Sequence, residues 1–327
     1  MSFWQGRKVF VTGGTGLMGG WLVKQLLADG ADVVLLVRDH TPKSMIVREG
    51  VIRQCGIVQG ELENLATLRR AYLEHEIDTV FHLAAQPIVG VAKLDPIGTL
   101  KANVEGTWNV LEAARNSGVK QMVVASSDKA YGSAERLPYD ESFPLEGRYP
   151  YDCSKSCADL ITTMYATTYQ LPVCVVRCAN LYGGGDLNFN RVIPGLIQST
   201  FRNEQFVIRS DGKFIRDFLY VKDAALGYML VAEKLAANRA MIGEAYNLSL
   251  ELRLSVLDLV GTLLKLLGRT DLEPVILNQA SAEIREQYML SLKARETLGW
   301  KPLYSLETGL LETIDWYHNF FKGSEPS

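Results

Sequence analysis

The sequence predicts an α/β protein with a doubly wound parallel sheet, covered by helices on both faces, and a smaller mixed C-terminal domain. Three observations predict this fold class. Short apolar, β-branched runs alternate with longer stretches of helical periodicity. The runs are continuously apolar, as expected for strands that are buried on both faces. A glycine-rich turn joins the first run to a helical stretch.

The first strand is predicted at 8–12, and a glycine fingerprint follows it directly. Glycines at 14, 16 and 19 match G-x-G-x-x-G, and glycine at 13 gives the variant with a wider first spacing. Without a Cβ, the backbone can turn tightly and approach a pyrophosphate, while helix N-terminal amides face its charge. We therefore predict a dinucleotide site rather than a turn without a ligand. Its expected contacts are Gly13, Gly16, Leu17, Met18 and Gly19.

Further strands and helices alternate through the first half of the chain. Strands are predicted at 32–37, 54–59, 79–83, 121–125 and 173–177, and helices near 62–75, 96–117 and 150–170. Helices between consecutive strands favour parallel pairing. We therefore expect the ligand crevice at the carboxyl ends of the strands.

The pattern loosens after three consecutive glycines at 183–185. Helices are predicted at 191–201 and 223–235, short strands at 206–209 and 214–221, and a last sheet strand at 245–248. We therefore expect a dinucleotide-binding Rossmann domain over 1–180, to which 221–250 returns. Residues 181–327 would form mainly the substrate-binding domain.

Composition excludes several function classes. The chain has 327 residues, 47% of them hydrophobic and 22% charged, which is typical of a globular enzyme with an ample core. A net charge of −3 disfavours nucleic acid as a partner. The sequence contains neither a long apolar run nor a signal-peptide core, so we expect a cytoplasmic protein that does not span a membrane. Five cysteines without a Cys-x-x-Cys pair and four scattered histidines predict reduced thiols and no metal site.

Two motifs carry candidate chemistry. Tyr151 and Lys155 are four residues apart in a predicted helix, so their side chains lie one turn apart. A phenol ionises near pH ~10, and a neighbouring ammonium together with the nicotinamide charge can lower that pKa enough for Tyr151 to act as a base. Tyr-x-x-x-Lys alone is a weak signal, but the glycine fingerprint upstream gives it weight. Ser127, Asp128 and Lys129 directly follow the strand at 121–125 and therefore face the same crevice.

These residues resemble the extended short-chain dehydrogenase/reductase family, which acts on nucleotide sugars. The resemblance covers almost the whole chain and includes the glycine fingerprint, 82–86, 102–107, Tyr151-x-x-x-Lys155, Arg216-Asp217 and 298–302. Within the family, 84–87, 126–129 and 183–186 are most similar to the branch of CDP-glucose 4,6-dehydratases. Two features differ from that branch. Gly90 replaces its arginine, and 216–221 resembles epimerases, decarboxylases and dTDP-sugar dehydratases instead.

The resemblance implies a lyase of deoxysugar biosynthesis that forms a 4-keto-6-deoxy sugar from NDP-glucose, with CDP-glucose favoured. Tyr151 would take the proton of the C4 hydroxyl, Lys155 would lower the pKa of Tyr151, and Ser127 would bind the same oxygen. Asp128 would then be the acid for the C6 hydroxyl and Lys129 the base at C5, although the base role is open between these two. The alternatives are a UDP-sugar C4-epimerase or a UDP-glucuronate decarboxylase or epimerase. A more remote alternative is a non-catalytic cofactor-sensing protein. A homodimer through a four-helix interface is also implied.

The family resemblance also implies cofactor and substrate contacts. NAD-preferring members carry an acidic residue where this chain has Val37, followed by Arg38 and Asp39. A guanidinium suits a 2′-phosphate, so NADP is slightly favoured over NAD. The remaining expected cofactor contacts are Glu61, Leu62, Leu83, Ala84, Ala85 and Asn103. The expected substrate contacts are Gln86, Ser127, Asn180, Arg191 and Arg216.

Overall fold

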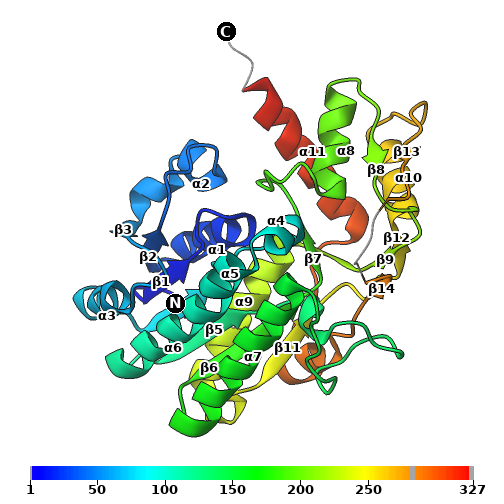
Figure 1. The fold of residues 1–327 in the computed structure, drawn as a ribbon. Coiled ribbons are helices and arrows are strands. Elements are labelled where there is room, and N and C mark those ends of the chain that lie inside the picture. Colours follow the sequence, from blue (N-terminus) through cyan, green and yellow to red (C-terminus); the bar gives the residue numbers. More distant parts are fainter. Residues whose placement is uncertain (1, 280–283, 324–327) are drawn as a thin grey trace.

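The computed structural model describes residues 2–279 and 284–323, and within them a seven-stranded, fully parallel sheet forms the centre of the molecule (Figure 1). In order across the sheet, the strands are β3 (Gly56–Gln59), β2 (Asp32–Val37), β1 (Lys8–Thr12), β4 (Thr79–His82), β5 (Gln121–Ala125), β6 (Val173–Cys178) and β11 (Ala245–Leu248). The strand order reverses between β1 and β4, which places the crevice there. The predicted doubly wound fold is confirmed.

Helices cover both faces of this sheet. On one face, α1 (Leu17–Ala28) packs against α9 (Val221–Ala237). On the other lie α3 (Leu65–Glu74), α6 (Gly106–Ser117) and α7 (Pro150–Tyr169), as Figure 1 shows. Successive strand residues point to opposite faces. Val33 and Leu35 therefore join the first core, while Val34 and Leu36 join the second. Both faces are apolar because both are covered, which explains the continuous apolar runs.

The helical stretch predicted near 96–117 is confirmed as three consecutive helical segments, and a further short helix precedes it. These are α4 (Val89–Leu94), α5 (Pro96–Leu100), the π-helical turn η2 (Lys101–Glu105) and α6. Asp95 accepts a hydrogen bond from the Gly98 amide and caps α5, whose first residue is Pro96. The smaller elements α2 (Met45–Arg48), η1 (Val51–Gln54) and η3 (Asp128–Tyr131) lie in connections between strands and helices.

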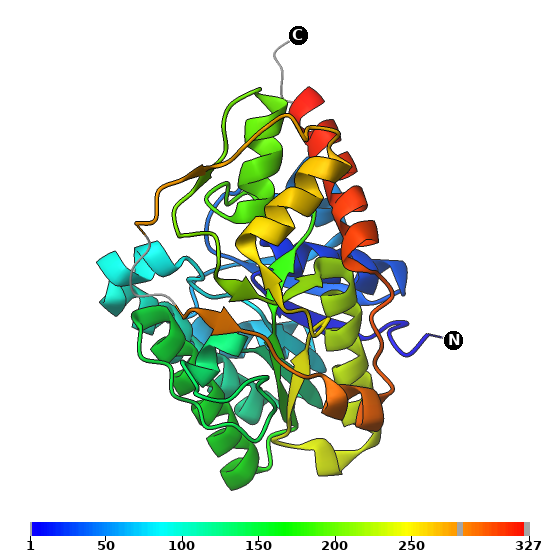
Figure 2. The same cartoon turned by 90° about the vertical axis from the view of Figure 1, so that its right-hand side faces the viewer.

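The C-terminal part is built from short strands and three helices, which lie beyond the sheet in Figure 2. The helices α8 (Val192–Phe201), α10 (Val256–Leu266) and α11 (Leu306–Lys322) surround a third core. The strand pairs are β7 (Asn180–Tyr182) with β10 (Phe218–Tyr220), β8 (Val207–Ile208) with β13 (Val275–Ile276), and β9 (Ile215–Arg216) with β12 (Leu254–Ser255) and β14 (Glu286–Gln287). Two further turns are η4 (Arg239–Met241) and η5 (Ala294–Leu298).

Two sequence predictions in this part need correction. The strand expected at 214–221 is two strands with different partners, and its last residue, Val221, begins α9. No element was predicted after 248, although α10 and α11 are long helices. Strand β11 pairs in parallel with β6, so the chain returns to the central sheet after the first C-terminal strands. The division of the chain into domains at residue 180 stays a prediction.

Candidate active site

The glycine turn after β1 has the shape of a backbone cradle. Gly13 adopts φ +73°, and a Cβ on it would lie 2.7 Å from the Ala84 nitrogen. A Cβ on Gly19 would lie 2.1 Å from the Gly13 carbonyl oxygen. Gly16 caps α1 without a side-chain hydrogen bond, so Leu17 and Met18 begin the helix with backbone amides that no capping side chain covers. These features fit a bound pyrophosphate, which needs close backbone approach and amide donors.

A buried polar network supports this cradle from below. The Thr12 hydroxyl accepts hydrogen bonds from the amides of Leu83 and Ala84, at 3.1 and 3.2 Å. His82 contacts Thr12 through Nδ1 at 2.8 Å and Thr107 through Nε2 at 3.0 Å. Burial, with the Lys155 charge adding to it, lowers the pKa of His82 to about 3. This histidine is therefore neutral, and it fixes the loop that carries the predicted contacts Leu83, Ala84 and Ala85.

Asn103 connects three parts of the site. Its Oδ1 accepts from the Gln86 amide at 2.7 Å, and its Nδ2 donates to the Gln86 carbonyl and to the Ser154 hydroxyl. The Gln86 side chain hydrogen-bonds within its own loop, to Ile88 and Thr99. The structure therefore gives both residues positioning contacts, and direct contact of either with a ligand stays a prediction.

The end of β2 carries the residues expected to choose the cofactor. The Arg38 Nε donates to Asp39 Oδ2 at 2.7 Å, and both side chains are more than 60% exposed. Glu61 is exposed after β3, whereas Leu62 is buried and packs where a Cβ on Gly106 would be, 2.8 Å away. The Leu62 carbonyl also accepts a hydrogen bond from Asn109. Leu62 therefore has a packing role, and its contact with the cofactor stays a prediction.

The structure brings Ser127, Tyr151 and Lys155 together at the carboxyl end of β5. Tyr151 lies in the first turn of α7, and the nearby Ser127 hydroxyl acts to lower the pKa of its phenol. Lys155 is buried, and its Nζ donates to the Ala125 carbonyl at 2.9 Å. Burial raises the pKa of Tyr151 to about 12, and the Asp128 charge adds to this. We expected Lys155 to lower this pKa, but the opposing groups here are Arg191 and Ser127, and burial of the phenol outweighs them.

Asp128 and Lys129 occupy the same site and do not form a surface ion pair. Asp128 is buried, and burial raises its pKa above the usual range, against the opposing charge of Lys129. The Ser127 hydroxyl donates to Asp128 Oδ1 at 2.9 Å, while Oδ2 is buried without a hydrogen-bond partner. The Lys129 Nζ donates to Gln287 Oε1 at 3.1 Å. A buried carboxyl with a raised pKa is suited to act as a general acid.

Sequence reasoning missed Asp152 and Gln287. Burial raises the pKa of Asp152 to about 6, with the charges of Lys129 and Arg216 opposing and that of Asp128 adding. Its position next to Tyr151 was the signal that could have found it. Gln287 lies on the short strand β14, fully buried, and no motif in its segment points to it.

The three substrate-binding residues predicted in the C-terminal part each contact a different set of groups. Arg216 is buried and donates from Nη1 to the carbonyls of Ile215 and Arg285, and its charge acts on Asp128. Arg191 begins α8 and pairs with Asp186 at 3.0 Å, and its charge acts on Tyr151. Asn180 donates to the Asp217 carbonyl at 3.0 Å. Arg191 and Arg216 therefore bring positive charge to the catalytic residues.

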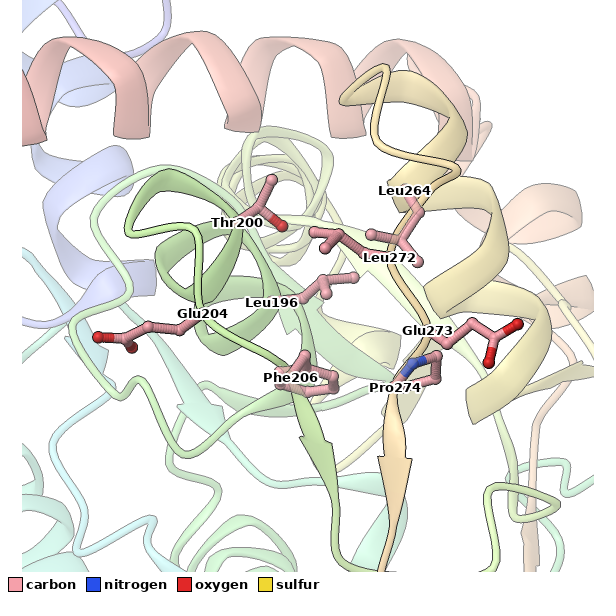
Figure 3. A pocket seen from close by; sticks show the side chains of 8 residues that line it. All are labelled: Leu196, Thr200, Glu204, Phe206, Leu264, Leu272, Glu273 and Pro274. Atoms are coloured by element: carbon pink, nitrogen blue, oxygen red, sulfur yellow. The ribbon is translucent and has the colours of Figure 1, made fainter.

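A separate hollow between α8 and α10 contains none of the predicted site residues (Figure 3). It is lined by Leu196, Thr200, Glu204, Phe206, Leu264, Leu272, Glu273 and Pro274. Figure 3 shows the carboxylates of Glu204 and Glu273 pointing away from the apolar side chains. Since this lining offers no cation, it does not suit a diphosphate.

Metal clusters and membrane-spanning helices are both absent from residues 2–279 and 284–323. These residues contain no group of three or more His, Cys, Asp or Glu side chains that could hold a metal ion. In the same ranges, no helix has the length and apolar character needed to cross a membrane.

Comparison with known proteins adds the family context. Residues 9–249 match the NAD dependent epimerase/dehydratase family. The CDP-glucose 4,6-dehydratase of Salmonella typhimurium is 32% identical, over 99% of this chain and 94% of that protein. The structure of dTDP-glucose 4,6-dehydratase from Bacillus anthracis in complex with NAD superposes with a TM-score of 0.85 at 27% identity, covering 97% and 98% of the two chains. UDP-glucose 4-epimerase from Thermotoga maritima, solved with UDP-glucose, gives 0.86 at 28% identity, covering 96% and 99%.

Proposed function

The chain belongs to the NAD dependent epimerase/dehydratase family, and from that premise we propose that it is a nucleotide-sugar 4,6-dehydratase. Its substrate would be an NDP-glucose, with CDP-glucose favoured, and its product an NDP-4-keto-6-deoxy sugar. One observation carries this proposal. Asp128, a buried acid with a raised pKa, lies with Lys129 beside the Tyr151–Lys155 pair. An acid and an amine at this position serve an elimination, whereas simple oxidation and reduction at C4 do not need them.

The first step is oxidation at C4 of the sugar. When bound, the nicotinamide accepts a hydride from C4 and later returns it to C6. Tyr151 takes the proton of the C4 hydroxyl, and Ser127 holds the same oxygen through its hydroxyl. The buried Lys155 supplies positive charge one helical turn from Tyr151, which favours the phenolate over the phenol.

The second step is loss of water across C5 and C6. The C4 ketone acidifies the C5 proton, which Lys129 takes through its side-chain nitrogen. Asp128 gives its proton to the C6 oxygen, the C6–O bond breaks, and the electron pair of the C5–H bond forms the C5–C6 double bond. Water leaves, so the step conserves charge and atoms. The desolvation that raises the pKa of Asp128 keeps this proton available.

The chain is an enzyme that uses a nicotinamide dinucleotide. A slight preference for NADP is part of the proposal and rests on Arg38, which is exposed at the end of β2. Asp39, its ion-pair partner, is the group that would bind the ribose hydroxyls of NAD instead. The two side chains therefore offer one group for each cofactor.

Substrate binding and assembly complete the proposal. Arg191 and Arg216 are the cations for the diphosphate, and Asn180 lies on β7, where it pairs with Phe218 on β10. A homodimer through α6 and α7 would cover large apolar side chains that are exposed in the single chain. They include Trp108, Leu160 and Met164, which are each more than 40% exposed.

A labelled substrate tests the dehydratase cycle. NDP-glucose carrying deuterium at C4 should give a keto-deoxy sugar with the label at C6. A product without deuterium at C6 would contradict the proposal. The test should be run on CDP-, dTDP-, GDP- and UDP-glucose to identify the nucleotide base of the substrate.

A C4-epimerase of a UDP-sugar is the second candidate. The 216–221 segment and the likeness to the Thermotoga maritima enzyme favour it. Product analysis separates the two functions, since an epimer keeps its C6 hydroxyl and a keto-deoxy sugar does not. A decarboxylase would release carbon dioxide and a pentose from UDP-glucuronate.

A further inference from the structure

Gln287 reaches the site from a distant part of the chain. It lies on β14 and pairs in register with Arg216 on β9, so the two side chains lie next to each other on the same face of this small sheet. Its side chain is fully buried. The Lys129 Nζ donates to Gln287 Oε1 at 3.1 Å. Because Lys129 Nζ is the donor in this contact, the amide is oriented with its oxygen toward Lys129.

In this orientation the Gln287 Nε2 group points away from Lys129. Within the described residues it is buried and has no hydrogen-bond partner. Leaving a buried donor unpaired costs about 1–3 kcal/mol, so this donor calls for a partner that the described residues do not supply. A second unpaired atom, Asp128 Oδ2, is also buried, and Lys129 is the chain neighbour of Asp128. Both unpaired atoms therefore belong to the immediate surroundings of Lys129.

The chemistry of these two atoms is complementary to one acceptor. The Ser127 hydroxyl occupies Asp128 Oδ1, so a protonated Asp128 carries its hydrogen on Oδ2. Both Oδ2–H and Nε2–H then donate. A sugar hydroxyl oxygen has two lone pairs and accepts two such bonds. This oxygen gains negative charge while its bond to carbon breaks, and a second fixed donor stabilises that charge.

We propose that Gln287 is a catalytic residue of the elimination, whose Nε2 donates to the departing C6 oxygen while its Oε1 holds Lys129. The inference rests on the proposed dehydratase function and deepens it. During the step, Asp128 transfers its proton to this oxygen, the C6–O bond breaks, and the Gln287 N–H keeps its own hydrogen. Gln287 thus acts as a leaving-group donor, in addition to the acid.

The test compares two leaving groups on the same sugar. The probes are CDP-glucose and CDP-6-deoxy-6-fluoroglucose, with the dTDP pair run in parallel, because fluoride leaves without needing a proton. Gln287→Met removes donor and acceptor at similar length, and Gln287→Glu keeps an acceptor for Lys129 while removing the donor. Gln121→Met is the matched control. Gln121 is also buried, but it lies at the amino end of β5, the end opposite to Ser127, and its side chain donates to Thr79.

We expect Gln287→Glu to lose about 10- to 100-fold in keto-deoxy sugar formation while fluoride release falls only slightly. Gln287→Met also removes the acceptor for Lys129, so it should slow both reactions, water loss more than fluoride loss. Gln121→Met should leave the ratio of the two rates unchanged. An equal loss on both probes would show a merely structural role and overturn the inference, as would wild-type rates in both variants. In either case wild-type dehydration would still support the proposed function. A wild-type enzyme that eliminates neither water nor fluoride would overturn the proposed function and this inference with it.

Discussion

The Lys155 ammonium donates a hydrogen bond to the Ala125 carbonyl oxygen, 2.9 Å away, and so joins α7 to the carboxyl end of β5. Burial lowers the pKa of Lys155 to about 8, against the charge of Asp159. The amine therefore changes charge in an accessible pH range, in a place where the proposed mechanism uses its charge to stabilise a phenolate.

This relationship predicts an alkaline limit for catalysis. Lys155 is protonated below pH about 8, so kcat/KM should fall as the pH rises through that value. Lys155→Arg keeps the charge at higher pH and should move the fall upward, although its bulk lowers the maximum. Lys155→Met should lose at least about 100-fold at every pH. The measurement is kcat/KM from pH 6 to about 10 in all three enzymes; an unchanged alkaline limb in Lys155→Arg would assign it to another group.

Cofactor choice is predicted to depend on Arg38. Arg38→Asp removes the guanidinium and should weaken NADP⁺ binding by roughly 10- to 100-fold while improving NAD⁺ binding. Calorimetric titration of both oxidised cofactors measures this. Asp39→Asn also breaks the ion pair but keeps the guanidinium, so NADP⁺ binding should persist in this control while NAD⁺ binding weakens. Tighter NADP⁺ binding in Arg38→Asp would contradict the NADP preference.

Gly19→Ala should abolish cofactor binding. The new Cβ would lie 2.1 Å from the Gly13 carbonyl oxygen, so the turn has to open and its amides move away from the pyrophosphate. The neighbouring Gly20→Ala is the control, because its Cβ would approach only the mobile end of Met45, at 3.0 Å. Titration with NAD⁺ and NADP⁺ compares the two variants, and equal weakening in both would refute a specific role for the turn.

A buried ion pair predicts a large effect on stability. Arg177 on β6 binds Asp159 on α7 through two hydrogen bonds, at 2.8 and 3.0 Å, and both are buried. Asp159→Leu leaves the guanidinium unpaired and should lower the free energy of unfolding by about 3–5 kcal/mol. Adding Arg177→Met should recover part of this loss. Glu74→Gln, in the exposed Arg70–Glu74 pair, should cost at most about 0.5 kcal/mol. Denaturant unfolding measures all four proteins, and similar losses in the two single variants would oppose this account.

Asp217 predicts a pH dependence of stability. Burial raises its pKa to about 7, despite hydrogen bonds from Ser249, Leu252 and Met289. The folded state therefore holds this proton more tightly than the unfolded state, whose pKa is about 4. The resulting stability is present below pH about 4 and is lost as the pH rises to about 7, by at most on the order of 4 kcal/mol.

Asp217→Asn removes this titration. The wild-type free energy of unfolding, minus that of the variant, should therefore fall between pH about 4 and 7 and stay level above it. The comparison cancels groups that both proteins share, including Asp152. Parallel stability curves for the two proteins would show that Asp217 does not titrate in this range.

The sheet could be predicted from sequence because its signal is local. The bounds of β1, β2, β5 and β11 match the predictions residue for residue. Each is a continuous apolar run, and burial on both faces is the reason for it. The glycine cradle was equally readable, since close backbone approach leaves glycine as the only fitting residue.

The remaining elements depend on distant partners. Strands β9, β12 and β14 are two residues long and exist only because they pair with one another across the chain. No period can be read from two residues, so β12, β14 and Gln287 on β14 were missed, and β9 was predicted only as part of a longer strand at 214–221. Asp152 was missed for a related reason, because its chemistry comes from burial and from charges on other elements. α10 and α11 carry ordinary helix signals, including a Ser255–Asp258 capping box, and were open to prediction.

The pairing of β11 with β6 also determines how the molecule comes into being. Strand β6 has a neighbour on both sides only once Val175 pairs with Ala245, 70 positions further along the chain. A chain emerging from the ribosome therefore cannot complete its central sheet until residues 245–248 have been made. A fragment ending at residue 180 would present the bare edge of β6 to its surroundings, which invites association with other chains. The two parts of the chain are interleaved in one sheet, so neither part can be replaced by joining a new segment at a single point.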